Sequence, residues 1–151
     1  QQGRTGALND TVASDGWNLV TQQTAEWNSE KAQQIVQSVI DSGKSFNVIY
    51  AENDDMAKGA VAALDKANIP HGVGKDVIVM GFDCNKWALE ELLNQNWNYD
   101  GQCNPFQASY IDDIIKKIEN GETISEKTII MDEKGFDATT ITQEDVDNYG
   151  I

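Results

Sequence analysis

The side chains in this sequence that are best suited to chemistry follow short β-rich runs. They are an indole, two carboxamides and a carboxylate, at Trp27, Asn53, Asn104 and Asp83. Planar carboxamide and carboxylate groups hydrogen bond to neighbouring hydroxyls, and the face of an indole packs on apolar C–H groups. A sugar ring presents both kinds of group. Because no nucleophile or proton shuttle stands out, the set predicts binding without a reaction and no enzymatic activity.

Short β-rich runs alternate with helical patterns along the chain, which is typical of βαβ units with a parallel sheet covered by helices. Apolar residues recur at helical spacing in four segments, residues 32–40, 56–67, 88–93 and 105–120. Five runs are predicted strands, residues 17–22, 46–50, 77–82, 97–102 and 128–131. The third run is almost continuously apolar, which indicates a central strand. The predicted fold class is α/β, a three-layer α/β/α sandwich with a mainly parallel, Rossmann-like sheet.

Capping residues predict several helix ends. Asparagine suits an N-cap and proline suits the first helical position, so residues 104–105 are expected to start a helix. The Asn-Gly pair at 120–121 is expected to end it. Thr142 with Asp145 three residues later predicts a capping box that starts a last short helix.

The candidate side chains share a position relative to the predicted strands. In an open parallel sheet, ligands bind in the crevice outside the carboxyl ends of the strands. The segments that follow the first four predicted strands are residues 24–27, 51–57, 82–83 and 102–105. These segments contain all four candidates, so one crevice is expected to hold them. Residues 1–151 show no linker or internal repeat, which predicts a single domain.

Charge and residue counts argue against several classes of function. The net charge is −14, from 25 acidic and 11 basic residues, and no basic stripe is present, so no nucleic-acid partner is expected. No apolar run is long enough for a membrane span. Cys84 and Cys103 lack the spacing of a zinc site, and the single histidine, His71, lies in an evident loop. Neither a metal site nor a cofactor is predicted.

Three segments together resemble the type I periplasmic sugar-binding proteins, the ribose- and galactofuranose-binding-like receptors of carbohydrate ABC importers. In chain order, the segments are YAENDDMAKGAVAAL, GKDVIVMGFD and CNP. In that family an asparagine of the first and an aspartate of the second contact the sugar, which implies these roles for Asn53 and Asp83. The resemblance also implies that Trp27 stacks on the sugar. The family's polar residue before the proline falls at Cys103 or Asn104, and Asn104 suits the chemistry better.

The family has two lobes with the sugar between them, and the resemblance implies that residues 1–151 are the C-terminal lobe without the N-terminal lobe. It implies a monosaccharide ligand and ABC transporter permease subunits as partners. It also implies a periplasmic or extracellular location, with anchoring through a membrane segment outside this sequence as one option. In the family the helix after the Asn-Pro pair packs on the other lobe. Four isoleucines should then form an exposed stripe that self-associates or pairs with a separate N-terminal lobe: Ile111, Ile114, Ile115 and Ile118.

The opening residues depart from the family. Residues 3–6 resemble the strand and turn that begin the C-terminal lobe. The family's next helix, which carries a ligand-contacting arginine, is nearly absent before Trp17. Residues 1–16 and 132–140 are the only weakly patterned stretches, and no element is predicted in either. The resemblance therefore assigns no arginine to the site.

Alternative interpretations stay open. Asn53 has the alternative role of capping the helix that follows it, and Trp27 that of packing on its own helix. A disulfide between Cys84 and Cys103 is geometrically conceivable in an exported protein. The same fold serves as the effector-binding domain of sugar-responsive LacI-type repressors or sensors. A small α/β enzyme is the remaining alternative, but no G-x-G-x-x-G, P-loop or nucleophile elbow is present.

Overall fold

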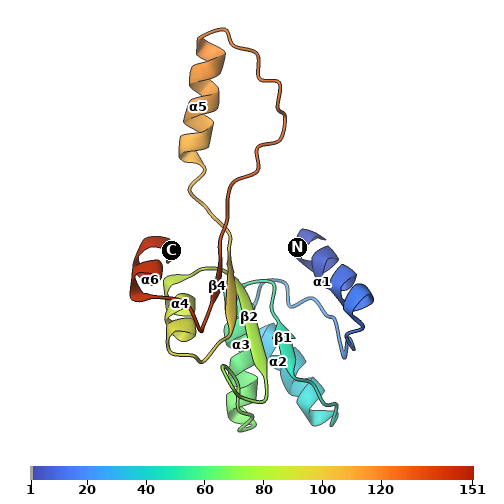
Figure 1. Cartoon of the computed structure of the whole chain (residues 1–151). Coiled ribbons are helices and arrows are strands. Elements are labelled where there is room, and N and C mark those ends of the chain that lie inside the picture. The colour runs from blue at the N-terminus through green and yellow to red at the C-terminus, as the bar shows by residue number, and fades with distance from the viewer. Residues whose placement is uncertain (1) are drawn as a thin grey trace.

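A four-stranded sheet organises the chain, and helices lie on both sides of it (Figure 1). The computed structural model describes residues 2–151. The helices are α1 (Gln2–Asp15), α2 (Ser29–Asp41), α3 (Asp54–Lys66), α4 (Lys86–Leu93), α5 (Ala108–Glu119) and α6 (Gln143–Tyr149). The strands are β1 (Val48–Tyr50), β2 (Ile78–Asp83), β3 (Tyr99–Gln102) and β4 (Gly135–Asp137). The predicted α/β class is confirmed.

The strands follow the order β1-β2-β3-β4, with the first three parallel and β4 antiparallel to β3. Parallel neighbours need a crossover connection, and a helix supplies it in both cases, α3 between β1 and β2 and α4 between β2 and β3. β2 lies inside the sheet, as its apolar sequence predicted. The carboxyl ends of β1, β2 and β3 therefore meet at one edge.

The core lies between the sheet and its helices. The helical stripe predicted within residues 56–67 faces inward, and its buried members are Ala57, Ala60, Ala63 and Leu64. The small side chains let α3 pack closely on α2. Trp97 is the largest fully buried side chain, and Trp87 packs edge to face on it with ring centroids 5.7 Å apart. Both tryptophans are therefore packing residues.

Most predicted helix ends are confirmed. α5 ends at the Asn-Gly pair 120–121, and the capping box begun by Thr142 starts α6. The predicted start of α5 at residues 104–105 is wrong, because the helix begins at Ala108. Asn104 Oδ1 accepts a hydrogen bond from Phe106 N at 2.8 Å, so this asparagine forms a turn of its own.

Two predicted strands do not form in the described part of the chain. Residues 17–22 are extended but pair with no strand, and residues 128–131 return along an arm that projects from the sheet (Figure 1). A strand needs a hydrogen-bonding neighbour, and neither segment has one. β4 forms instead within residues 132–140, where no element was predicted. Its Phe136 turns into the core while the two flanking residues stay exposed.

The opening residues form α1, although no helix was expected there, so residues 3–6 lie in a helix and not in the strand and turn that they resemble. α1 has no buried residue. A helix that buries no face against the core needs no continuous apolar stripe, and this explains the weak pattern of residues 1–16.

Gly59 sets how closely α3 approaches the start of α2. A Cβ at this position would lie 2.0 Å from the backbone oxygen of Ser29. We expect Gly59→Ala to force the helices apart and to lower the free energy of unfolding by about 1–3 kcal/mol, as measured by urea denaturation. Gly6→Ala in α1 is the matched control, because nothing lies within 4 Å of its Cβ and alanine favours helix. Equal effects of the two substitutions would contradict this packing account.

Candidate ligand-binding site

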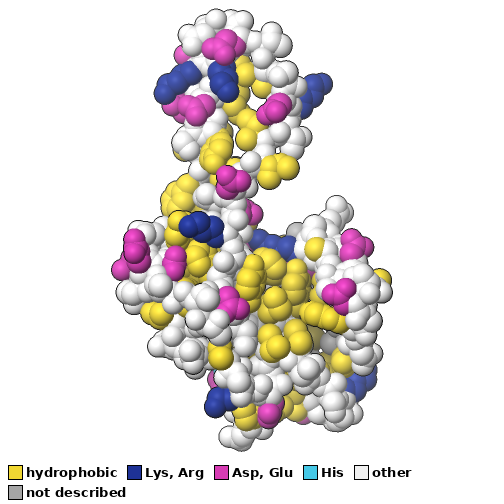
Figure 2. All heavy atoms as spheres, viewed as in Figure 1, with side chains coloured by type: hydrophobic (Ala, Val, Ile, Leu, Met, Phe, Trp, Pro, Cys, Tyr) yellow, Lys and Arg dark blue, Asp and Glu magenta, His cyan; other side chains and the backbone are white. Residues whose placement is uncertain are grey.

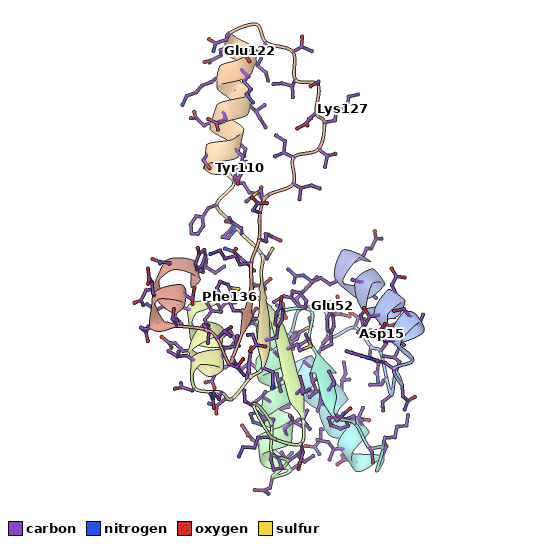
Figure 3. All side chains as sticks on the ribbon, in the orientation of Figure 1. Asp15, Glu52, Tyr110, Glu122, Lys127 and Phe136 are labelled. Carbon is purple, nitrogen blue, oxygen red and sulfur yellow. The ribbon has the colours of Figure 1, made fainter. Side chains whose placement is uncertain are left out.

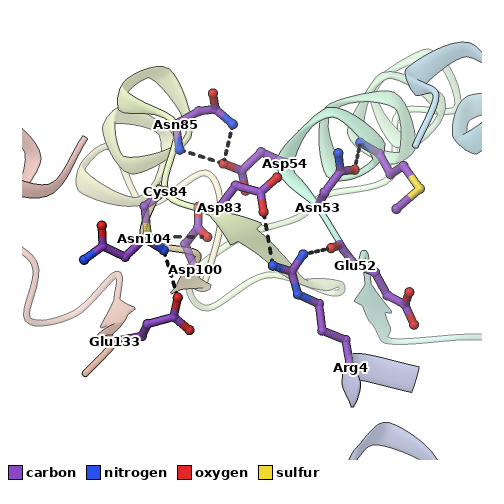
Figure 4. A network of polar contacts seen from close by, with 11 residues as sticks. Arg4, Glu52, Asn53, Asp54, Asp83, Cys84, Asn85, Asp100, Asn104 and Glu133 are labelled. Atoms are coloured by element: carbon purple, nitrogen blue, oxygen red, sulfur yellow. Dashed lines mark hydrogen bonds and ion pairs between the residues drawn. The ribbon is translucent and has the colours of Figure 1, made fainter. Parts of the chain in front are cut away.

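Polar side chains from α1, β1 and β2 meet at the carboxyl edge of the sheet (Figure 4). Arg4 of α1 donates a hydrogen bond to Asp83 Oδ1 at 3.2 Å and another to the backbone carbonyl of Glu52. The same guanidinium lies over the Phe82 ring, 4.8 Å from its centroid. The Tyr50 hydroxyl donates to the Arg4 carbonyl at 3.2 Å. Arg4 is therefore held against the ends of β1 and β2.

Asp83 ends β2 in a strained conformation. Its φ is 121° and that of Cys84 is 61°, both in a region that side chains with a Cβ rarely adopt. Such strain persists where the surrounding structure holds the chain, and it clusters at ligand sites. The Asp83 side chain is 28% exposed. Burial raises the pKa of this carboxyl, and the Arg4 guanidinium opposes that rise. The site thus presents an acceptor group beside a cation.

Asn53 precedes α3, and only one of the two polar atoms of its side-chain amide has a hydrogen-bond partner. Its Oδ1 accepts a hydrogen bond from Met56 N at 2.9 Å, so it caps the helix. Its amide nitrogen has no partner among residues 2–151, and the residue is 8% exposed. Because the cap uses only the oxygen, the NH₂ group is available to donate to a ligand. The capping and binding interpretations of Asn53 are therefore compatible.

The other two predicted site residues lie at the flanks. Trp27 is 47% exposed, with a φ of 61°, in the loop before α2. Asn104 follows β3, and its backbone N–H donates to Glu133 Oε1 at 2.8 Å. Within the described chain, neither side chain hydrogen bonds to Asn53 or Asp83. The structure places Asn53, Asp83 and Asn104 after or at the ends of β1, β2 and β3, at the same edge of the sheet (Figure 4), and Trp27 in the loop before α2.

A large cavity lies beside this crevice. Its volume is about 700 Å³, and it is lined by α1, α2, β1 and the segment 17–27. Trp27 and Glu52 belong to its lining, whereas Asn53, Asp83 and Asn104 do not. The helices line it with apolar side chains. The segment 17–27 adds polar side chains to the lining, among them Asn18, Gln22 and Glu26.

Two fully buried carboxyls, Asp54 and Asp100, lie close to Asp83. Asp54 Oδ2 accepts hydrogen bonds from Asn85 N at 2.8 Å and Asn85 Nδ2 at 3.0 Å. One oxygen of each carboxyl, Asp54 Oδ1 and Asp100 Oδ2, is buried without a hydrogen-bond partner among the described residues. Burial raises the pKa of Asp54 to about 6, and burial with the neighbouring Asp54 charge raises the pKa of Asp100 to about 9. Two carboxyls this close resist joint ionisation, so the pair shares a proton.

The described residues contain neither a disulfide nor a cluster that could hold a metal. Cys84 is buried and Cys103 is exposed, and both are free thiols. Within residues 2–151, no group of three or more His, Cys, Asp or Glu side chains could hold a metal ion. None of the described helices is long and apolar enough to cross a membrane.

Comparison with known proteins identifies the family. A sequence model described as "Periplasmic binding protein domain" matches residues 1–120. The chain belongs to this family. The fructose import binding protein FruE of Bifidobacterium longum is 31% identical over 132 residues, covering 86% of this chain and 38% of FruE. The ribose import binding protein RbsB of Bacillus subtilis is 31% identical over 84 residues, covering 56% of this chain and 26% of RbsB.

Solved structures of periplasmic binding proteins have the same fold. An ABC transporter solute binding protein from Actinobacillus succinogenes with bound D-allose has a TM-score of 0.78 and 26% identity, covering 98% of this chain and 50% of that one. The binding protein of the arabinose ABC transporter from Shewanella sp. ANA-3 has a TM-score of 0.81 and 22% identity. The match covers 90% of this chain and 45% of that one. The chain spans half or less of the length of these relatives. The resemblance to periplasmic sugar-binding proteins is confirmed.

Arg4 is the site residue that the sequence did not reveal. Because no helix was expected before Trp17, the resemblance assigned no arginine to the site. α1 does form, so the expectation that no helix precedes Trp17 is wrong, and its first turn brings Arg4 against Asp83. The available signal was the pair Leu8 and Val12, which stand four residues apart, as on one helical face.

The buried Asp54 and Asp100 pair predicts how stability depends on pH. Both carboxyls hold protons more tightly in the folded chain than in the unfolded chain, where their pKa is about 4. Stability therefore falls as pH rises from about 4 through the folded pKa values of about 6 and about 9. Asp100→Asn keeps a hydrogen-bond donor toward Asp54 and removes one titrating group. We expect this variant to exceed the native chain in thermal stability at pH 9 and to lose that advantage toward pH 4.

Asp76→Asn, in an exposed loop, is the matched control and should leave the pH profile unchanged. A native stability that rises between pH 6 and pH 9 would contradict the shared proton. So would an Asp100→Asn profile with the same slope as the native one.

Proposed function

We propose that this chain binds a monosaccharide at the carboxyl edge of its sheet, as part of the extracytoplasmic solute receptor of a carbohydrate ABC importer. The observation that carries the proposal is the Arg4 and Asp83 ion pair beside the free amide of Asn53. These groups donate and accept hydrogen bonds in one crevice, as neighbouring hydroxyls require. They include no nucleophile with a partnered base, so binding without chemistry fits them.

Each site residue has its own role in the proposal. Asp83 accepts hydrogen bonds from sugar hydroxyls, and Arg4 both holds Asp83 and donates to a sugar oxygen. Asn53 donates through its amide nitrogen. Trp27 stacks on the apolar face of the ring, and Asn104 contributes from the β3 side when the receptor closes.

The names of the relatives support a sugar ligand. Two of them are import binding proteins for fructose and ribose, and the Actinobacillus succinogenes structure holds D-allose. Since these sugars differ, they support a class of ligand, the monosaccharides, rather than one compound. The same names support ABC transporter permease subunits as partners and a periplasmic or extracellular location.

Binding is measured by thermal shift and tryptophan fluorescence against a panel of pentoses and hexoses, with this chain and with a two-lobed protein that contains it. We expect a stereospecific response, because single hydroxyls face Asp83, Arg4 and Asn53. Asp83→Asn removes the ion pair and a charged acceptor, so it should weaken binding by roughly 10- to 100-fold.

Asp76→Asn again serves as the control and should bind like the native chain. If neither protein shows a thermal shift or a fluorescence change with any sugar of the panel, the proposal of sugar binding is refuted. If Asp83→Asn responds to the sugar as the native chain does, the sugar binds outside this crevice.

We also propose that residues 1–151 form one domain, the C-terminal lobe of a two-lobed receptor whose other lobe covers α5. α5 and the return segment 121–134 project from the body as an arm, marked in Figure 3 by Tyr110, Glu122 and Lys127. α5 has no buried residue. Its exposed apolar side chains are Tyr110, Ile111, Ile115 and Ile118, and Ile114 is half-buried. An apolar face of this kind calls for a partner surface.

The uncovered arm predicts self-association of the chain by itself. We expect sedimentation velocity to show concentration-dependent association of the native chain. Ile111→Lys combined with Ile118→Lys should restore a monomer without loss of thermal stability, because neither side chain is buried. Asp113→Asn combined with Asn120→Lys gives the same change in net charge, +2, on the opposite face and should leave association intact. A native monomer at every concentration would contradict the prediction.

A further inference from the structure

Phe82 carries an aromatic ring to the place where Arg4 meets the strand ends. Alternate residues of a strand point to opposite faces of the sheet, so Phe82 belongs to the face opposite the fully buried Val79. Figure 2 shows hydrophobic side chains gathered over β1 and β2, next to α1. Phe82 is half-buried, and its ring offers a surface on which the first turn of α1 packs.

The Phe82 ring contacts both a cation and a second aromatic ring. Arg4 Cζ lies over the ring, 4.8 Å from its centroid, and the Tyr50 ring packs against it at a centroid distance of 5.3 Å. The face of an aromatic ring attracts a cation, and the attraction is stronger where water is partly excluded. The Arg4 side chain is only 22% exposed. The ring therefore helps to determine where the guanidinium lies.

Gly101 leaves room for this ring on the neighbouring strand. Phe82 pairs with Gly101 across β2 and β3, and a Cβ on Gly101 would lie 2.6 Å from Phe82 Cδ1. Gly101 does not have a positive φ, so space rather than backbone conformation explains the glycine. A glycine inside a strand often marks a place where another group approaches closely. Here the approaching group is the Phe82 ring.

The Arg4 guanidinium is held by three contacts and keeps unused donors. It donates to Asp83 Oδ1 and to the Glu52 carbonyl, and the Phe82 ring lies against it. Among residues 2–151, the Arg4 side chain makes no other hydrogen bond. A guanidinium has five N–H donors, and contact with an aromatic ring occupies none of the acceptors that they need. The remaining N–H groups can therefore donate to a ligand.

We propose that Phe82 is a positioning residue of the ligand site, whose ring, seated over Gly101, holds Arg4 in the orientation that donates to a ligand while it is paired with Asp83. Arginine has a long side chain that loses much rotamer freedom when it is ordered. Fixing it before the ligand arrives lowers the ordering cost of binding. The effect on the ligand rests on the proposed function, whereas the effect on Arg4 and Asp83 does not.

The first test needs no ligand and measures the pKa of the Asp83 carboxyl in this chain by carbon-13 NMR. Burial raises this pKa and the Arg4 guanidinium lowers it, so release of Arg4 should raise it further. We expect a higher pKa of Asp83 in Phe82→Leu, which lacks the aromatic face, and in Gly101→Ala, whose Cβ displaces the ring. Phe82→Tyr keeps the ring and should retain the native pKa.

Two controls separate positioning of Arg4 from a general loss of packing. In an Arg4→Gln background the cation is absent, so Phe82→Leu should no longer raise the pKa of Asp83. Tyr99→Leu removes another half-buried ring from the same face of the sheet, and within the described chain no hydrogen bond or cation–π contact joins Tyr99 to Arg4. This variant should keep the native pKa of Asp83. Phe82→Leu and Gly101→Ala perturb the ring independently, so either variant decides the question if the other does not fold.

The second test measures affinity for D-ribose, D-fructose and D-allose in a two-lobed protein that contains this chain. For a sugar that the native protein binds, Phe82→Leu should weaken binding by roughly 3- to 30-fold, and it should have no further effect in the Arg4→Gln background.

An unchanged pKa of Asp83 in Phe82→Leu and Gly101→Ala would overturn the proposal. So would an equal rise with and without Arg4, or native affinity of Phe82→Leu for a bound sugar. A raised pKa of Asp83 with no response to any of the three sugars would support the positioning of Arg4 and contradict the proposed function, so the two failures are distinguishable.

Discussion

Asp54 makes the interaction on which the carboxyl edge of the sheet depends. It is the first residue of α3, it is fully buried, and it joins α3 to the start of α4 through Asn85 and to β3 through Asp100. Burying a carboxyl is costly, and two hydrogen bonds from Asn85 to Asp54 Oδ2 offset part of that cost, so α3 and the start of α4 keep fixed relative positions. Gly81 leaves little freedom, because a Cβ there would lie 2.7 Å from Asp54 Oδ1. These contacts of Asp54 form a clamp that holds the carboxyl ends of the strands in place.

This clamp explains how Asp83 keeps its strained backbone. Asp83 pairs with Gln102 across the sheet, and the chain two residues later is tied to Asp54 through Asn85. A φ of 121° in a residue with a Cβ costs about 1–3 kcal/mol, and the structure tolerates it because both sides are held. The Asp83 carboxylate is therefore positioned by the sheet rather than by a loose loop. A ligand that bonds to it meets a preformed group, which lowers the ordering cost of binding.

The sequence predicted those parts of the fold whose signals are local. The helical stripe within residues 56–67 and the apolar run at 77–82 report burial directly, and Asn53 and Asp83 were found because they follow strands. The strand predicted at 17–22 failed for a non-local reason, since its pattern is present but no strand among residues 2–151 pairs with it. β4 was missed because only one of its residues, Phe136, is buried, and a single apolar residue does not give the alternating pattern that predicts a strand. Arg4 was missed because α1 buries no face, and only contacts far apart in the sequence reveal its place.

α1 contributes side chains both to the crevice and to the cavity beside β1, and its polar contacts with the sheet lie at one end. Arg4 bonds Asp83 and Glu52, and Thr5 bonds the Glu52 side chain, so the described polar contacts between α1 and the sheet come from its first turn. Farther along the helix, Leu8 and Val12 face the cavity beside β1. Because Arg4 and Val12 belong to one helix, the packing of α1 along the lining of that cavity helps to set where Arg4 lies at the strand ends.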